Sequence, residues 1–225
     1  SVILSPETRP VDCSVPGRGS VACGHAAPRA TGRTLVIPSF VDSWRSSQLR
    51  EHNLPLEERW VLGCFMGLGV GKAYSMTENF RDSLAVLSDL PGFWIGGYDA
   101  RYAEIMGASV FCLIPKGVGT WSHRLFEALL AGCVPVILSD EMEPPFPELH
   151  WSEFSLRHPM HAVDNTTFPA MLEGLYHSGR AAAMKRSVDA HACWFDYHSE
   201  SPDCSPLVGI TARLPAGRRA TSAGG

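Results

Sequence analysis

Residues 111–140 have the sequence FCLIPKGVGTWSHRLFEALLAGCVPVILSD, and this stretch decides the fold. The run SVFCLI that leads into it (residues 109–114) is continuously apolar, and so is VPVIL (residues 134–138) near its end. Such runs are typical of strands that are buried on both faces of a parallel sheet. Between them a glycine-containing loop leads into the short apolar segment RLFEALL, which predicts a helix. A strand, a loop, a helix and a second strand in this order form one βαβ unit.

Strands and helices alternate over most of the remaining chain. WVLGCFM (residues 60–66) and FWI (93–95) predict further strands, with shorter ones at Thr34–Ile37 and within residues 150–156. Four segments predict helices, at residues 77–90, 98–109, 166–178 and 180–198. This alternation predicts an α/β fold, with a Rossmann-like parallel sheet flanked by helices. The polar residues 46–59 are expected to form a connector, and residues 1–32 and those after Cys204 are expected to lack regular structure.

Composition excludes several classes of protein. The net charge of −4 and the pI of about 6.1 give no global basic field, so no nucleic-acid partner is expected. No apolar run is long enough to cross a bilayer, and no signal peptide is visible. The seven cysteines lack zinc-like spacing, so no zinc site is expected from them. Cys112 and Cys133 are expected to be small core residues, whereas Cys13 with Cys23, and Cys193 with Cys204, are candidate disulfide pairs.

The loop after the strand at residues 109–114 has the features of an anion site. Gly117 and Gly119 allow the backbone to approach a ligand closely, and Lys116 adds a positive charge. Thr120 or Ser122 can cap the following helix, whose free N–H groups favour a phosphate. The pattern is neither a Walker sequence nor GxGxxG, so an ordinary turn between strand and helix explains the glycines as well.

The helix itself carries two charged residues among apolar ones. Arg124 and Glu127 are three residues apart and so share a face of the helix. An arginine there can form bidentate bonds with a phosphate, and a carboxylate can accept bonds from the paired hydroxyls of a ribose. The alternative interpretation is a plain surface ion pair between Arg124 and Glu127, worth under about 1 kcal/mol.

The same residues carry a resemblance to a known family. FCLIPKG followed by WSHRLFEALLAGCVPVILSD resembles the signature of exostosin-type glycosyltransferases, family 47. The resemblance continues through PPF (residues 144–146) and HWSEFS (residues 150–155), and more weakly over residues 35–198. It implies a GT-B architecture, in which two Rossmann-like domains face each other and the C-terminal one holds a nucleotide sugar, usually a UDP sugar.

The resemblance also implies a reaction and a place. Members of the family that resemble this chain make glycosaminoglycan-like or cell-wall polysaccharide linkages in the Golgi, so a Golgi membrane or lumen location is expected. The sugar passes to a glycan or glycoprotein acceptor hydroxyl with inversion. Enzymes of this architecture generally need no metal, so the resemblance implies that neither a metal nor another cofactor is required. Assembly with the same or a related transferase, as a homo- or hetero-oligomer, is a further expectation.

Roles for individual residues follow by position. Glu127 is similar to the glutamate that holds the ribose; Arg124 and Ser122, with the Lys116–Gly117 turn, correspond to the diphosphate side. Ser139 and Asp140 border the same pocket, although a Ser-Asp turn that ends a strand explains them equally. Asp140, Glu141 and Glu143 lie near enough in sequence to be candidate bases, but the catalytic base is not assigned. Asn165 begins a glycosylation sequon, and Asp164, Asn165 or Thr166 can equally cap the next helix.

The resemblance predicts a division of the chain. Residues 1–59 are interpreted as the end of an N-terminal, acceptor-side domain with a linker, residues 60–200 as the nucleotide-sugar-binding domain, and residues 201–225 as a flexible tail. Fewer than sixty residues are short for a Rossmann-like half. The alternative function is therefore a catalytically incomplete relative that binds a nucleotide or a glycan.

Overall fold

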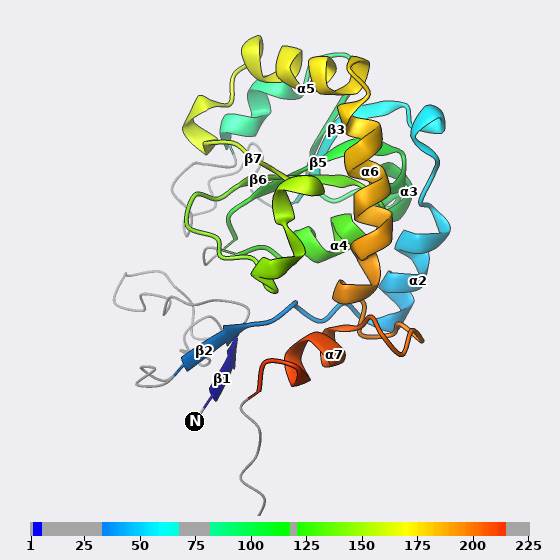
Figure 1. Cartoon of the computed structure of the whole chain (residues 1–225). Coiled ribbons are helices and arrows are strands. Elements are labelled where there is room, and N and C mark those ends of the chain that lie inside the picture. The colour runs from blue at the N-terminus through cyan, green and yellow to red at the C-terminus, as the bar shows by residue number, and fades with distance from the viewer. Residues whose placement is uncertain (1, 6–32, 68–81, 118–120, 215–225) are drawn as a thin grey trace, which may run out of the picture.

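The computed structural model describes residues 2–5, 33–67, 82–117 and 121–214. The predictions for residues 6–32, for Cys13 and Cys23, for Gly119 and Thr120, and for the tail after residue 214 lie outside this part of the chain. Within it, the order of strands and helices follows the predicted α/β alternation (Figure 1). None of the described helices has the length and the apolar character that crossing a lipid bilayer requires.

The core of the structure is a five-stranded parallel sheet with the order β4-β3-β5-β6-β7. Its strands are β3 (Val61–Met66), β4 (Phe93–Gly96), β5 (Ser109–Pro115), β6 (Val134–Leu138) and β7 (Leu156–Arg157). All residues of β5 and β6 are buried, which explains their continuous apolar sequences. The predicted parallel sheet is confirmed.

Helices flank this sheet. They are α2 (Ser43–Glu51), α3 (Tyr102–Gly107), α4 (Arg124–Leu130), α5 (Thr167–His177), α6 (Arg180–His191) and α7 (Pro206–Thr211). Short 3-10 turns are η1 (Leu56–Glu58), η2 (Asp82–Leu87), η3 (Pro147–Leu149), η4 (Trp151–Glu153), η5 (Met160–Ala162) and η6 (Ala192–Phe195). The described half of the helix expected at residues 77–90 is the turn η2.

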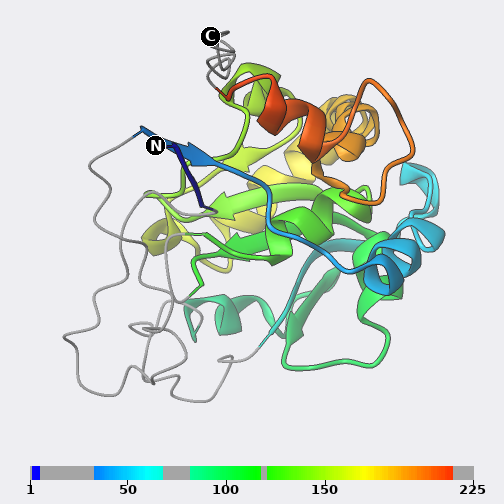
Figure 2. The ribbon, with the colours of Figure 1, turned by 90° about the horizontal axis from the view of Figure 1, so that it is seen from below.

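A second, small sheet lies apart from the first. It consists of the parallel strands β1 (Val2–Ser5) and β2 (Arg33–Val36). Among the described strands, these two pair with each other and with no other strand. In Figure 1 they lie below the main sheet on the side of α7, and the view from below in Figure 2 agrees. Helix α7 occupies part of the segment that was expected to be a flexible tail, because Ile210 is buried there.

The expected connector at residues 46–59 is instead largely helical. Its polar residues form most of α2, which packs against α3 and α4. Asp196, only 3% exposed, accepts hydrogen bonds from the Ser46 hydroxyl at 3.1 Å and from the Arg50 guanidinium. The Tyr197 hydroxyl likewise donates to the carbonyl oxygen of Pro38 at 2.9 Å. Contacts from the far end of the chain therefore stabilise a helix that has few apolar residues of its own.

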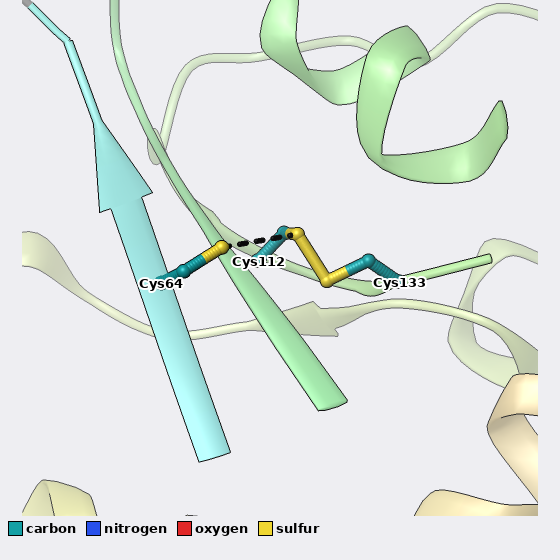
Figure 3. Close-up of side chains that lie close together, drawn as sticks. All are labelled: Cys64, Cys112 and Cys133. Atoms are coloured by element: carbon teal, nitrogen blue, oxygen red, sulfur yellow. Dashed lines mark hydrogen bonds between the residues drawn. A yellow bond between two sulfur atoms is a disulfide. The ribbon is translucent and has the colours of Figure 1, made fainter. Parts of the chain in front are cut away.

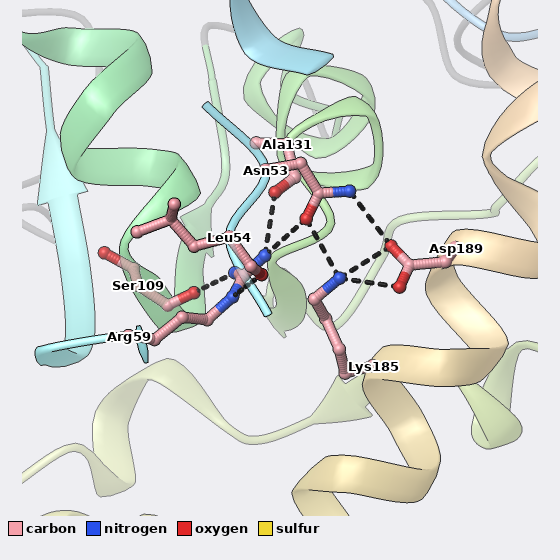
Figure 4. Close-up of polar contacts among 7 residues, drawn as sticks. All are labelled: Asn53, Leu54, Arg59, Ser109, Ala131, Lys185 and Asp189. Atoms are coloured by element: carbon pink, nitrogen blue, oxygen red, sulfur yellow. Dashed lines mark hydrogen bonds and ion pairs between the residues drawn. The ribbon is translucent and has the colours of Figure 1, made fainter. Parts of the chain in front are cut away.

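A buried arginine joins several elements at the amino-terminal edge of the sheet (Figure 4). The Arg59 guanidinium donates to the carbonyl oxygens of Leu54, Ser109 and Ala131 at 3.0, 2.5 and 3.1 Å, and to Asn53 Oδ1 at 2.6 Å. Burial lowers the pKa of Arg59 to about 10, so the side chain keeps its charge at neutral pH. Arg59 thereby satisfies backbone acceptors at the start of β5 and the end of α4.

The same network extends to α6. Lys185 Nζ donates to Asn53 Oδ1 at 2.9 Å and to both carboxylate oxygens of Asp189 at 2.7 and 2.6 Å, as Figure 4 shows. Asn53 Nδ2 donates in turn to Asp189 Oδ1 at 3.1 Å. Asn53 thus links the turn after α2 to a helix more than a hundred residues away in sequence. Its side-chain oxygen and nitrogen both form hydrogen bonds, as polar groups in protein interiors usually do.

Three sulfur atoms meet inside the sheet (Figure 3). Cys112 of β5 forms a disulfide with Cys133, which directly precedes β6, and Cys64 Sγ of β3 lies 3.5 Å from Cys112 Sγ. All three are buried core residues, as expected for Cys112 and Cys133, but the bond between those two was not predicted. Burial raises the pKa of the Cys64 thiol to about 11, so it stays protonated. The candidate pair Cys193–Cys204 is also bonded.

Candidate functional site

The predicted site residues follow strands that end at one edge of the sheet. Because β3, β4, β5 and β6 are parallel, their carboxyl ends at Met66, Gly96, Pro115 and Leu138 lie along the same edge. Lys116 and Gly117 follow β5, and Ser139 and Asp140 follow β6. Ligands of open parallel sheets bind outside the carboxyl ends of the strands. The topology therefore brings these four residues to the edge at which a ligand is expected.

The turn after β5 is tight and depends on a glycine. The Gly117 N–H donates to the Trp121 carbonyl oxygen at 3.1 Å, and a Cβ at position 117 would lie 2.7 Å from that same oxygen. The Gly117 amide is therefore already bonded within the turn. Ser122 is buried, but α4 begins after His123 and has no side-chain capping bond, so the predicted cap by Ser122 is wrong.

Arg124 reaches across to the end of β3. Its Nη2 donates to the Met66 carbonyl oxygen at 2.5 Å, and its guanidinium carbon lies 4.6 Å from the centre of the Phe65 ring. Gly67 permits this approach, because a Cβ there would lie 2.6 Å from Arg124 Nη2. The buried Arg124 Nε has no hydrogen-bond partner among the described residues. The guanidinium of Arg124 is thus held in place at the carboxyl edge by its bond to Met66.

Glu127 lies one turn further along α4 and is held from two other helices. Tyr102 at the start of α3 donates its hydroxyl hydrogen to Glu127 Oε2 at 2.6 Å. Arg45 in the first turn of α2 places its Nε 3.9 Å from Glu127 Oε1. The glutamate side chain is 13% exposed. In the described part of the chain no ion pair joins Glu127 to Arg124, so the alternative of a plain surface pair between them is wrong.

The residues after β6 differ in their surroundings. Ser139 is buried, and its carbonyl oxygen accepts from the Met142 N–H at 3.3 Å, which closes a turn. Asp140 is exposed. Asp140 is therefore available to a ligand or to solvent, whereas Ser139 is part of the turn that ends the strand.

Sequence reasoning missed Tyr102 and Arg45. No local motif marks either residue, and Arg45 lies next to the segment that was interpreted as a connector. The only signal was topological: α3 follows a parallel strand, so its first residue must lie at the carboxyl edge. A further contact at this edge joins Ser39 Oγ to His123 Nδ1 at 2.8 Å.

A separate pocket of about 610 Å³ lies elsewhere, beside the Arg59 network. Residues from η1, α5 and α6 line it, among them Leu56, Tyr176, Lys185 and Asp189. Lys185 and Asp189 bind each other, as described above. Because η1 precedes β3, this pocket lies toward the amino-terminal edge of the sheet and not at the predicted site.

The predicted sequon lies at the start of α5. Asn165 is exposed, which a glycosylation acceptor requires. Asp164 accepts bonds from the Thr167 hydroxyl and from the backbone N–H groups of Thr166, Thr167 and Phe168. These bonds hold the pKa of Asp164 well below its usual range. Thr166 occupies the N-cap position without a capping bond from its own side chain, and the carboxylate of Asp164 instead accepts the bonds from the first N–H groups.

The fold is a parallel α/β sheet, and the side chains of Arg124 and Glu127 from helix α4 lie at its carboxyl edge, where ligands of such sheets bind. The sequence profile of the Exostosin GT47 domain matches residues 38–172, which is more than half of the chain. The chain therefore belongs to the exostosin glycosyltransferase family 47.

Curated relatives carry related names. A probable glucuronosyltransferase of Oryza sativa subsp. japonica is 40% identical over 139 residues, which are 55% of this chain and 31% of the relative. Probable glucuronosyltransferase GUT1 of the same organism is 38% identical over the same shares. Probable glucuronosyltransferase 47 A of Physcomitrium patens is 35% identical over 138 residues, 55% of this chain and 29% of the relative. The chain spans about a third of the length of these relatives.

Proposed function

We propose that the chain is the donor-binding part of an inverting glycosyltransferase, which moves a sugar from a UDP sugar to a hydroxyl of a glycan or glycoprotein. The observation that carries this proposal is Glu127, a carboxylate held at the carboxyl edge of the sheet, with the Arg124 guanidinium on the same helix. Membership of family 47 supports the reaction class. A sugar that is a uronic acid is suggested by the names of the relatives.

Each side chain has a chemical role in this proposal. The carboxylate of Glu127 accepts hydrogen bonds from the ribose hydroxyls. The positive charges of Arg124 and Lys116 offset the charge that develops on the leaving diphosphate, a role that fixed side chains can fill without a metal. Ser122, which lies between these two residues in the sequence, is assigned to the same diphosphate side, and Asp140 at the same edge of the sheet is assigned to the transferred sugar. No residue is assigned as the catalytic base.

The wider setting follows from the family and is part of the proposal. The chain works in the Golgi, and the secretory pathway that leads there allows Asn165 to be glycosylated. Its acceptor binds against a second, N-terminal domain, of which residues 1–59 form the end, while residues 60–200 hold the donor. The sequence profile match begins within the first of these segments, at Pro38.

Calorimetric titration of uridine diphosphate (UDP) into the chain tests the proposed function. We expect binding, and we expect uridine monophosphate to bind about tenfold more weakly, because it lacks the second phosphate that Arg124 and Lys116 would pair with. A panel of UDP sugars, with UDP-glucuronic acid among them, then tests hydrolysis and transfer. Binding without turnover supports the catalytically incomplete relative. No binding of either nucleotide contradicts the transferase and a nucleotide-binding relative, and only a relative that binds a glycan would remain.

A further inference from the structure

The two carboxylate oxygens of Glu127 face side chains from two different helices, one through a hydrogen bond and the other through a longer ion pair. Oε2 accepts the hydrogen bond from the Tyr102 hydroxyl at 2.6 Å, and Oε1 faces Arg45 Nε at 3.9 Å. A glutamate side chain has three rotatable bonds. If nothing restrains the side chain, it loses conformational entropy when a ligand orders it. With contacts to both oxygens, the orientation of this carboxylate is set before any ligand arrives.

Tyr102 and Arg45 also contact each other. The guanidinium carbon of Arg45 lies 5.1 Å from the centre of the Tyr102 ring and 4.8 Å from that of its neighbour Trp44. A guanidinium over an aromatic face is held in place by the charge distribution of the ring. The three residues therefore form one cluster, which we name the Glu127 clamp: Arg45 of α2, Tyr102 of α3 and Glu127 of α4.

The Tyr102 hydroxyl keeps its proton and can therefore donate a hydrogen bond to Glu127. Tyr102 is partly buried, and its burial together with the negative charge of Glu127 raises the pKa of its hydroxyl far above the usual value. The hydroxyl therefore stays protonated and donates to the carboxylate at physiological pH. Each carboxylate oxygen has more than one lone pair, so the clamp leaves acceptor capacity for ligand hydroxyls.

We propose that Tyr102 and Arg45 are positioning residues, which hold the Glu127 carboxylate in the orientation that reads the ribose hydroxyls of a bound nucleotide. This inference rests on the proposed function and adds to it the residues that determine the preference for ribose over deoxyribose. A purely structural bond between Tyr102 and Glu127 would stabilise the fold without affecting that preference. The two roles are therefore separable by experiment.

The experiment compares UDP with 2′-deoxyuridine diphosphate in calorimetric titrations. The unaltered chain is expected to bind UDP about tenfold more tightly, because 2′-deoxyuridine diphosphate lacks one hydroxyl that would donate a hydrogen bond to the charged carboxylate. Tyr102→Phe removes only the hydroxyl, and we expect it to weaken UDP binding and to lower the preference for UDP to less than about threefold. The matched control is Tyr98→Phe, the same change at a residue that is 88% exposed, and it is expected to keep the full preference.

Each outcome is decisive. A full tenfold preference in a folded Tyr102→Phe chain overturns the positioning role while the proposed function stands. No UDP binding by the unaltered chain overturns the proposed function and the positioning role with it. If Tyr102→Phe does not fold, as a thermal melting curve would show, Arg45→Gln takes its place: a reduced preference supports the clamp, and an unchanged preference overturns it.

Discussion

Replacement of Arg59 by methionine is expected to lower the free energy of unfolding by about 3–5 kcal/mol. Methionine fills a similar volume but donates no hydrogen bonds. Two buried carbonyl oxygens, those of Ser109 and Ala131, would lose a partner, and so would the partly buried carbonyl oxygen of Leu54 and the side chain of Asn53. Because Arg59 is only 7% exposed, water cannot readily replace the lost bonds.

Urea denaturation of both chains measures this difference. The matched control is Arg101→Met, because the Arg101 side chain is half exposed and its nearest carboxylate, Asp99, lies 3.5 Å away. That change is expected to cost less than about 1 kcal/mol, as is usual for an exposed ion pair. A loss below about 1 kcal/mol for Arg59→Met as well would show that the Arg59 network does not hold the amino-terminal edge together.

Replacement of Glu127 by alanine is expected to weaken UDP binding by about a hundredfold while the chain stays folded. The estimate takes two hydrogen bonds from ribose hydroxyls to a charged acceptor, each worth about 1.5 kcal/mol. The fold should tolerate the change, because Glu127 is not fully buried and its side chain makes one hydrogen bond among the described residues, to Tyr102, besides the ion pair with Arg45. Calorimetry gives the affinity, and a thermal melting curve gives the stability.

Glu173→Ala on the exposed face of α5 is the control for the loss of one negative charge. We expect it to leave the affinity for UDP unchanged. If Glu127→Ala instead lowers the melting temperature strongly and leaves the affinity for UDP as it was, Glu127 is a structural residue and not a ligand-binding one.

The sheet was predictable because its central strands are buried on both faces. Any strand that is buried on both faces of a parallel sheet requires a continuous apolar sequence, whichever elements cover it. The apolar runs that contain Leu113, Ile114, Val136 and Ile137 could therefore be identified as strands from the sequence alone. Helix α2 was not predictable in the same way. Only Ser46 and Leu49 of its nine residues are buried, and its position depends on contacts with Asp196, which is distant in sequence.

The candidate site shows the same division. Arg124 and Glu127 were predicted because charges on an otherwise apolar helix stand out in the sequence. Their partners Met66, Tyr102 and Arg45 come from three other elements, and only the packing of those elements determines which atoms meet. The disulfide between Cys112 and Cys133 was missed for a related reason, because it depends on the register of β5 against β6.

A crystal structure of the chain with bound UDP tests the proposed donor site. We expect the nucleotide at the carboxyl edge of the sheet, with its ribose hydroxyls within hydrogen-bond distance of Glu127 and its diphosphate beside Arg124 and Lys116. Nucleotide bound at the other edge, in the pocket lined by Leu56 and Tyr176, or with its ribose away from Glu127, would contradict this proposal.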